Sequence, residues 1–258
     1  MLTYNSRWGT PLCVAIGFLG FFSTVSCKKD DDGSMTQTIV IYVDSTVVPP
    51  DAVMDVDGHV YSTTVIGTQR WMAANLRTSH YANGDPIPYA PDGTEWGGLT
   101  TAAWVNYDVD ASYDQIYGKL YNWYTVSDPR NVCPSSWHVP SDEDWFELEQ
   151  TLGVPVADLD NTGPRGEAAN SGGRLKSEVL WESPNTGAND SSAFSAFPGG
   201  VRANNGTFIN LGLKGSWWST SEFNSSMGWQ RKLTNDNAGI DRLGALKSAG
   251  ASIRCVED

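Results

Sequence analysis

Two short runs of oxygen-bearing side chains have the composition of a calcium site. The first, Asp55-Val56-Asp57-Gly58, begins like the loop of an EF-hand. Such a loop needs a bidentate Glu at its twelfth position, and that position, counted from Asp55, is Ile66. We therefore expect a tight turn there. The second run, NDN at 235–237, offers amide and carboxylate oxygens, but clusters of this kind usually form loops.

The histidines are the other candidates for acid–base or metal chemistry. There are three, His59, His80 and His138, and no two have the spacing of metal ligands. His138 lies between Trp137 and Val139, which is typical of a half-buried strand residue. The sequence has no phosphate-binding loop and no GxGxxG, HExxH or GxSxG motif. We therefore predict no catalytic residue, no metal ligand and no cofactor.

Carboxylates are abundant, because 30 Asp and Glu stand against 17 Lys and Arg for a net charge of −13. This excess argues against a nucleic-acid partner, whose phosphates are bound by Lys and Arg, and against a polybasic membrane-surface protein. Glu143, Glu147 and Glu149 lie on the clearest predicted helix, and we expect them on its solvated face. A glycosidase needs two carboxylates about 5–10 Å apart in a cleft, so a carboxylate-dependent hydrolase or modifying enzyme remains an alternative function.

Tryptophan gives the strongest signal, with 11 copies. Trp217 and Trp218 are adjacent, so in a strand they face opposite sides. An outward Trp near Trp96 or Trp104 could stack on a sugar ring or anchor a protein partner. The alternative is that these side chains belong to the core. We predict Trp96, Trp104, Trp217 and Trp218 as ligand-binding residues.

The cysteines bear on the cellular location. Cys13 lies in an apolar run, residues 12–22, that is shorter than the about 20 residues of a membrane-spanning helix and suits a secretory signal. An exported domain is permitted disulfides. Beyond Cys27 only Cys133 and Cys255 remain, so a single intramolecular pairing is possible. Two free thiols are the alternative.

Cys27 lies where a signal peptide would end. STVSC at 23–27, followed by KKDDD, resembles the end of a bacterial lipoprotein signal, with Thr24 where Leu is usual. The resemblance implies that Cys27 is diacylated and becomes the mature N-terminus, and two acyl chains anchor stably. An ordinary secretory signal with a spare Cys is the alternative. The charged run also resembles the tract that sends some Bacteroidetes lipoproteins to the outer face of the outer membrane, or it is a solvated linker.

The chain therefore divides into a signal peptide at 1–26, an acidic tether at 27–52 and a folded domain at 53–258. Within the tether, TIVIYV at 38–43 is β-prone. In the domain, residues 53–72 predict a β-meander, and strands and turns run from 181 to a last strand near 251–256.

The helix signals lie in the middle of the domain. Ser141 is a good N-cap for a helix that ends at Gly153, with Trp145, Leu148 and Leu152 on one face. A second helix is predicted over 167–177. We expect an α+β fold with short twisted sheets, one or two helices and long loops rich in Gly and Pro.

A series of ordered motifs runs from residue 57 to residue 256. They are DGHVY at 57–61, IGTQRWMAANL at 66–76, YGKLYNWY at 117–124, CPSSWHVPSD at 133–142, GGRLK at 172–176, WESPNTG at 181–187, FSAFPGGVR at 194–202, GSWWSTSE at 215–222 and SIRCV at 252–256. With these motifs the sequence resembles the Fibrobacter succinogenes major paralogous domain. Ser136 stands where that family usually has Gly, and Ala74 where it often has Glu.

The resemblance implies a C-type-lectin-like fold, which formylglycine-generating enzymes share, with a disulfide that ties the last strand. It also implies a secreted or lipid-anchored protein of Bacteroidetes or Fibrobacteres. It brings no reaction, because only Cys255 lies late in the chain where formylglycine-generating enzymes use a Cys pair, and the Glu-Pro-Asn and Gln-Pro-Asp tripeptides of calcium-dependent lectins are absent.

The sequence thus favours a lipoprotein of the outer membrane, facing the cell exterior, whose non-enzymatic domain binds a glycan or a protein. It contacts the membrane only through its lipid. A third possibility is a structural component of cell-surface assemblies that self-associates through residues 38–43.

Overall fold

The computed structural model describes residues 21–29, 35–43 and 51–258, which belong to two separate units divided after Pro49. In the first unit, β1 (Phe21–Lys29) and β2 (Met35–Val43) form an antiparallel hairpin in which Cys27 lies opposite Gln37. The β-prone segment 38–43 is therefore a strand. Cys13, residues 12–20 of the apolar run and residues 30–34 and 44–50 of the tether lie outside the described residues.

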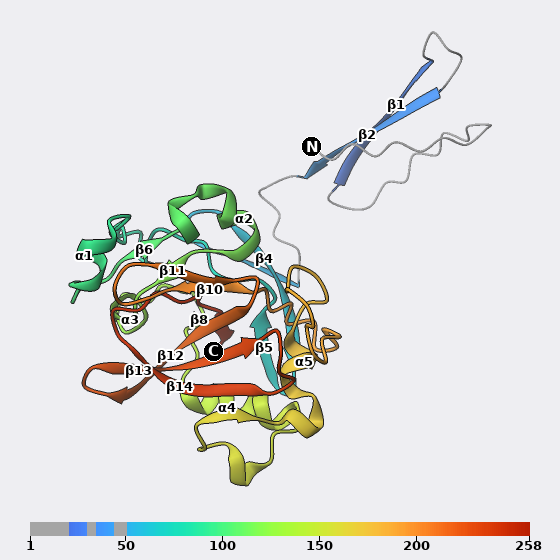
Figure 1. Ribbon diagram of the computed structural model, residues 1–258. Helices are drawn as coiled ribbons and strands as arrows, with labels where there is room; N and C mark the ends of the chain where they lie inside the picture. The colour runs from blue at the N-terminus through green and yellow to red at the C-terminus, as the bar shows by residue number, and fades with distance from the viewer. Residues whose placement is uncertain (1–20, 30–34, 44–50) are drawn as a thin grey trace. The chain divides into compact units, whose positions relative to one another are not determined.

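The second unit holds the predicted α+β fold, with two larger sheets and a two-stranded one (Figure 1). The five-stranded sheet has the order β3-β4-β5-β15-β8, from β3 (Ala52–Met54), β4 (Val60–Ile66), β5 (Gln69–Met72), β15 (Val256–Glu257) and β8 (Trp137–His138). The six-stranded sheet has the order β11-β10-β12-β13-β14-β9, from β11 (Phe208–Leu211), β10 (Gly199–Arg202), β12 (Lys214–Asn224), β13 (Met227–Thr234), β14 (Ile240–Leu246) and β9 (Gly163–Arg165). The small sheet pairs β6 (Trp104–Val105) with β7 (Leu120–Tyr121).

The meander predicted over 53–72 is confirmed, because β3, β4 and β5 pair antiparallel in sequence order. The last strand is β15, and it lies between β5 and β8, so the last strand of this unit pairs with one early strand and one central strand. Just before it, Ala251 and Ser252 make single bridges to Tyr121 and Trp217. The C-terminal segment thereby joins all three sheets of this unit.

The helices are short, apart from the one that the sequence indicated most clearly. Helix α4 (Asp142–Thr151) begins at a capping box, in which Ser141 accepts from the Asp144 backbone N–H and the Asp144 carboxylate accepts from that of Ser141. Trp145 and Leu148 lie on its buried face. The others are α1 (Gly93–Gly97), α2 (Asp114–Tyr117), α3 (Trp123–Val126) and α5 (Ser171–Leu175), the last within the predicted 167–177.

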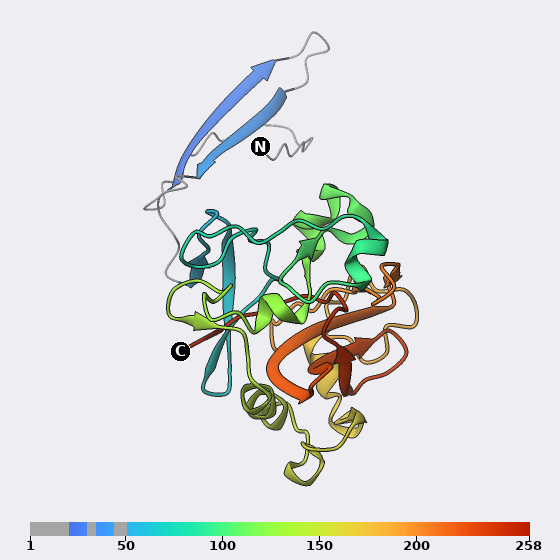
Figure 2. The same ribbon diagram turned by 90° about the vertical axis from the view of Figure 1, so that its left-hand side faces the viewer.

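The hydrophobic core is built from residues of both large sheets. One buried cluster contains Trp71, Trp145 and Trp217, and the ring centroids of Trp71 and Trp145 are 4.9 Å apart. A second cluster surrounds Cys133 and Cys255. In Figure 2 the helix α4 lies at the lower side of this unit, and the loops and short helices between residues 80 and 126 (teal to green) lie at the opposite side. The site described below lies in those loops.

In the part of the chain that the structure describes, no helix has the length and apolar character needed to span a bilayer.

Candidate functional site

Trp217 and Trp218 point to opposite sides of β12, as predicted, but both sides are covered. Their exposed fractions are 1 % and 0 %. The indole N–H of Trp217 donates to Asn75 Oδ1 at 2.8 Å, and that of Trp218 to the Tyr121 carbonyl at 2.8 Å. Because the rings and their N–H groups are both satisfied inside the protein, the prediction that these two residues bind a ligand is wrong.

Trp96 is also a core residue. It is 0 % exposed in α1, and the guanidinium of Arg202 lies 4.5 Å from its ring centroid. The prediction that Trp96 contacts a ligand is therefore wrong as well. Its burial follows from a loop that folds back, because Gly206 brings its backbone against Gly93 at the start of α1.

Trp104 differs, because it is only half-buried. Its indole N–H donates to the carbonyl of Ile87 at 2.9 Å, and its ring lies 4.7 Å from that of Tyr89. The Trp104 backbone N–H also donates to the Pro88 carbonyl at 3.0 Å. Trp104 therefore holds the segment 87–89 in place, and Pro88 of this segment lines a surface pocket together with Pro86.

That pocket is shallow and has a volume of about 460 Å³, within the about 300–1,000 Å³ of small-molecule sites. Its lining combines two prolines, four small side chains, one aromatic ring and an ion pair. The residues are Pro86, Pro88, Thr100, Thr101, Ala102, Tyr124, Ser127, Asp128 and Arg130. The prolines, the threonines and Ala102 come from the Gly/Pro-rich segment 86–102. The other four lining residues come from the short helix α3 and from the residues that follow it.

Tyr124 faces this pocket because of the way α3 begins. The Asn122 side chain accepts from the Thr125 N–H at 3.2 Å and caps the helix. Trp123 then points inward, 6 % exposed, and its indole donates to the Ser219 carbonyl at 3.0 Å. The next side chain, Tyr124, is left half-buried at the surface. Among the described residues no protein group is hydrogen-bonded to its hydroxyl, so that hydroxyl is available to a ligand.

Asp128 and Arg130 form a fixed ion pair at the rim of the pocket. Arg130 donates from Nε to Asp128 Oδ1 at 2.9 Å and from Nη2 to Oδ2 at 2.7 Å. These bonds lower the pKa of Asp128 to about 2. The guanidinium also lies 4.0 Å from the Tyr81 ring centroid and contacts Asp85 at 3.1 Å. The Asp128 carboxylate is therefore ionised at physiological pH and is held in one orientation.

The predicted turn at Asp55–Gly58 is confirmed, and its oxygens already have protein donors. Asp55 is 4 % exposed and accepts from the backbone N–H of His59, its Nδ1 and the Tyr61 hydroxyl. Asp57 accepts from His80 Nδ1 at 2.6 Å. Within residues 51–258 and the two described strands before them, no group of three His, Cys, Asp or Glu side chains is placed to hold a metal ion.

Glu149 was predicted on the solvated face of its helix, and this is wrong. It is 0 % exposed, and it accepts from Arg165 and, at 2.5 Å, from Arg231 Nε. Asp142, at the start of the same helix, accepts from Arg231 and from Arg242. These carboxylates join α4 to β9, β13 and β14 inside the core. Glu143 and Glu147 are exposed, as predicted.

The disulfide between Cys133 and Cys255 is confirmed, with Cα atoms 6.0 Å apart. Both residues are 0 % exposed. The bond joins the segment just before β15 to the segment that follows α3, and thereby fixes the base of the loop that carries Asp128 and Arg130.

The sequence analysis missed the residues that line the pocket, and it predicted only that the loops of this domain are rich in Gly and Pro. Tyr124 ends the motif YGKLYNWY, in which Asn122 is a good helix N-cap, but this local pattern does not show which of the next two aromatic side chains faces outward. Asp128 and Arg130 are two positions apart with Pro129 between them, which favours a local turn and a local ion pair.

Comparison with known proteins gives one result. The model of the Fibrobacter succinogenes major domain matches residues 65–257, which is most of the chain and nearly all of its second unit. No curated protein and no solved structure matches the chain.

Proposed function

Because the chain belongs to the Fibrobacter succinogenes major domain family, which brings no known reaction with it, we propose a function from the pocket itself: a non-enzymatic domain that binds glycans. The single observation that supports this most is the half-buried ring of Tyr124, whose hydroxyl is free and which lines the same pocket as the Asp128 carboxylate, ionised at physiological pH. The pocket is formed before a ligand arrives, because the ion pair and the bracing by Trp104 hold its walls.

A saccharide suits this lining. A sugar ring has a face of C–H groups, which packs against an aromatic ring or proline, and a rim of hydroxyls that need acceptors and donors. Tyr124, Pro86 and Pro88 supply the apolar surfaces. The ionised Asp128 carboxylate can accept charge-assisted hydrogen bonds from sugar hydroxyls, and these are about twice as strong as neutral hydrogen bonds. Thr101 and Ser127 supply hydroxyls.

The hydrolase alternative is less well supported. General acid catalysis by a carboxyl group near neutral pH needs a raised pKa, whereas the pKa of Asp128 is lowered to about 2. Asp142 and Glu149 are paired with arginines in the core and do not line this pocket.

The site of anchoring is part of the proposal. A lipid on Cys27 would hold the domain at the outer membrane, facing the exterior, with residues 28–52 as the spacer. The resemblance to the Fibrobacter succinogenes major domain family also leads us to propose a C-type-lectin-like fold. Loop clusters on rigid sheets are common places for binding sites, and here the disulfide fixes the loop base.

The proposal is tested by applying the purified mature domain to a glycan array and measuring the affinity of any hit by calorimetry. Tyr124→Ala and Asp128→Asn are each expected to weaken binding by about tenfold or more, because each removes one of the two main contacts. Phe223→Ala is the matched control. Phe223 is an exposed aromatic residue, 42 % exposed, that packs on Trp229 and does not line the pocket.

Thermal unfolding of each variant separates loss of the site from loss of the fold. No glycan hit on the array, or a hit whose affinity is unchanged in both pocket variants, would exclude glycan binding at this site. A protein ligand whose affinity falls in the same two variants would reassign the pocket to protein recognition.

The assembly alternative has one observation in its favour. Cleavage before Cys27 would remove residues 21–26, which pair with residues 38–43 of β2. The mature protein would then carry β2 with an open edge, and open edges pair with other chains. Sedimentation of the mature protein against a form lacking residues 35–43 tests this: a dimer that persists without β2 would exclude it.

A further inference from the structure

The charges in the pocket of Tyr124 do not balance. Its lining contains one carboxylate, that of Asp128, and one guanidinium, that of Arg130. Beside the lining, Asp85 supplies a second carboxylate, whose Oδ2 accepts from Arg130 Nη1 at 3.1 Å. These three side chains, called the ion-pair group below, combine two negative charges with one positive charge. The group is therefore net negative, in a chain whose own net charge is −13.

The two carboxylates are ionised at neutral pH. Hydrogen bonds from Arg130 lower the pKa of Asp128 to about 2. Hydrogen bonds from Asn83 and Arg130 lower the pKa of Asp85. The Arg130 guanidinium is a permanent cation. The ion-pair group therefore keeps its excess negative charge under the conditions in which a ligand would be bound.

A ligand in the pocket can reach this charge. The side chains of Asp85 and Arg130 are 51 % and 40 % exposed, and that of Asp128 is 18 % exposed. All the other residues that line the pocket are half-buried or exposed. Oδ1 of Asp85 accepts no hydrogen bond among the described residues, since the bonds to this carboxylate end on Oδ2. A negatively charged acceptor is thus open to solvent at the rim of the pocket.

Arg130 does not offer a binding place for an anion. Each of its three guanidinium nitrogens already donates to a carboxylate oxygen, at distances of 2.7–3.1 Å. The guanidinium also lies 4.0 Å from the ring centroid of Tyr81. Among the residues that the structure describes, no other Lys or Arg lines the pocket. A carboxylate or sulfate on a sugar would meet two like charges and no available cation, which disfavours its binding.

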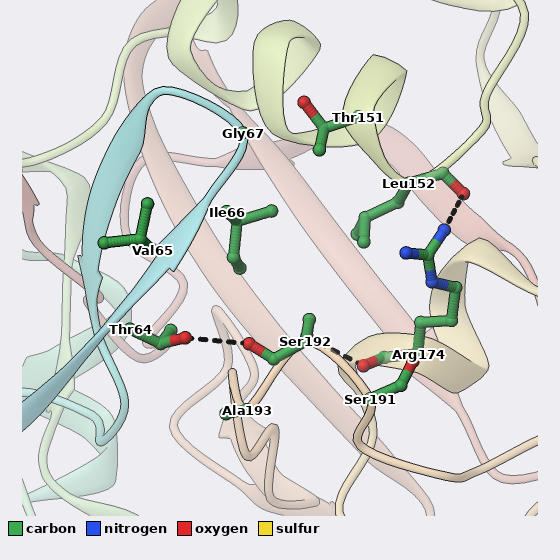
Figure 3. Close-up of a pocket in the computed structure, with 10 residues that line it drawn as sticks. All are labelled: Thr64, Val65, Ile66, Gly67, Thr151, Leu152, Arg174, Ser191, Ser192 and Ala193. Carbon is green, nitrogen blue, oxygen red and sulfur yellow. Dashed lines mark hydrogen bonds between the residues drawn. The ribbon is translucent and has the colours of Figure 1, made fainter.

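A second pocket of the domain has the opposite character (Figure 3). It has a volume of about 310 Å³ and shares no lining residue with the pocket of Tyr124. Its charged residue is Arg174, whose Nη1 donates to the Leu152 carbonyl at 3.2 Å. In the chain from residue 51 onward, no Asp or Glu oxygen lies within 4.0 Å of the Arg174 guanidinium. An anion that binds the domain can pair with Arg174, so binding in the first pocket has to be observed at Tyr124 itself.

We propose that the pocket of Tyr124 selects saccharides by charge, binding protonated amino sugars more tightly than neutral sugars and disfavouring acidic ones. This proposal rests on the glycan-binding function proposed above. The ring of Tyr124 and the two prolines contact the sugar ring, as they would for a neutral sugar, and the ion-pair group attracts the ammonium group. Two opposite unit charges about 4 Å apart in water gain the equivalent of about fivefold in affinity.

The lysine side chain of a protein partner carries the same ammonium group, but it suits the rest of the lining less well. Its stem is a flexible chain without hydroxyls. The lining instead pairs a tyrosine ring and two proline rings with the hydroxyls of Thr101 and Ser127. A rigid ring with a C–H face and hydroxyls at its rim uses both kinds of surface.

The test measures binding of glucose, glucosamine, N-acetylglucosamine and glucuronic acid to the full chain by NMR titration, observed at the ring signals of Tyr124. At about pH 6 the amine of glucosamine is protonated. Glucosamine is expected to bind about fivefold or more tighter than glucose and than N-acetylglucosamine, which has an uncharged group at the same position. Glucuronic acid is expected to bind most weakly. Salt at about 1 M should reduce these differences, because it screens charges beyond about 3 Å.

Two variants each remove one negative charge from the ion-pair group. Asp85→Asn, outside the lining, is expected to lower the ratio of glucosamine affinity to glucose affinity about twofold or more, and Asp128→Asn to bring it close to one. Glu143→Gln is the matched control, because it removes the same charge from an exposed position on α4 that does not line the pocket, and it should leave the ratio unchanged. Each ratio compares two ligands on one variant, so partial unfolding affects both affinities equally.

Equal affinities of glucosamine and glucose, or a ratio that neither Asp85→Asn nor Asp128→Asn changes, would overturn the charge selection and leave glycan binding intact. Glucuronic acid that binds at Tyr124 more tightly than glucose would do the same. Nα-acetyl-lysine amide that binds there more tightly than glucosamine would overturn the proposal in favour of a protein partner. No change at Tyr124 with any of the four sugars would overturn the proposal together with the function on which it rests.

Discussion

Nε of Arg231 lies 2.5 Å from Oε1 of Glu149, and both side chains are 1 % exposed or less. The same guanidinium donates from Nη1 to Asp142 at 2.5 Å. One arginine on β13 thus holds both ends of helix α4, through its first residue and through a residue in its last turn. Since Glu149 also accepts from Arg165, its carboxylate neutralises charge from two strands.

Removing Glu149 should destabilise the domain strongly. Glu149→Ala leaves Arg165 and Arg231 buried beside a lost partner, and breaking a buried pair from one side costs about 3–5 kcal/mol. The free energy of unfolding in urea measures this. Glu143→Ala, an exposed position on the same helix, should stay within about 0.5 kcal/mol of the parent. Equal stability of the two variants would contradict the buried network.

Reducing the disulfide should also lower stability. The two cysteines are 122 residues apart, and closing a loop of this size restricts the unfolded chain by about 4–5 kcal/mol in the loop-entropy model. We expect the urea midpoint of Cys133→Ala/Cys255→Ala to fall well below that of the oxidised parent. If a reductant shifts the midpoint of the parent but not of the double variant, the change comes from this bond.

His138 should make stability depend on pH. A hydrogen bond to Asp144, reinforced by one to Asp258 and opposed by burial, raises the pKa of His138 above its ordinary value of 6.5. A raised pKa means that the folded state binds the proton more tightly, so the stabilisation is complete below the unfolded pKa and is lost as the pH rises through the folded one. His138→Gln should therefore cost more stability at about pH 5.5 than at about pH 8.5.

The same shift can be read directly by NMR. Asp258→Asn removes one partner of His138 at a position where the carboxylate side chain is 59 % exposed, so it should lower the His138 pKa without unfolding the domain. A His138 pKa at or below 6.5 in the parent would contradict the hydrogen bonds described.

Export should modify Cys27. We expect mass spectrometry of the protein from membranes to find a chain that begins at Cys27 with a diacylglyceryl group, and Cys27→Ser to be released from the membrane. Cys13→Ser is the matched control and should be processed normally, because Cys13 lies within the predicted signal peptide, residues 1–26. An unacylated chain that retains residues before Cys27 would contradict the lipoprotein prediction.

Local signals in the sequence predicted the elements with strong end markers. Helix α4 was predicted because Ser141 and the acidic residues after it form a cap. The pairing of Cys133 with Cys255 was one of two alternatives, the other being two free thiols, once Cys13 and Cys27 were assigned to the predicted lipoprotein signal. These features depend on neighbouring residues or on simple elimination, so tertiary packing did not change them.

The failures all depend on contacts between distant parts of the chain. Period-two alternation placed Trp217 and Trp218 on opposite sides of a strand, but it contained no information that both sides would be covered. Glu149 is buried because its partners, Arg165 and Arg231, lie 16 and 82 residues away in the sequence and carry the opposite charge. The pocket of Tyr124 likewise needs the loop 86–88 beside α3, which no single segment predicts.

The five-stranded sheet contains both the first and the last strand of the domain, β3 and β15, with only β4 and β5 between them. At about 4.8 Å per strand, the points where the chain enters and leaves lie on the order of 14 Å apart. A domain with such closely placed ends can be inserted within another protein, or repeated in tandem, through short connecting peptides and without disturbing its host. This architecture therefore lends itself to reuse as a transferable cassette in larger chains.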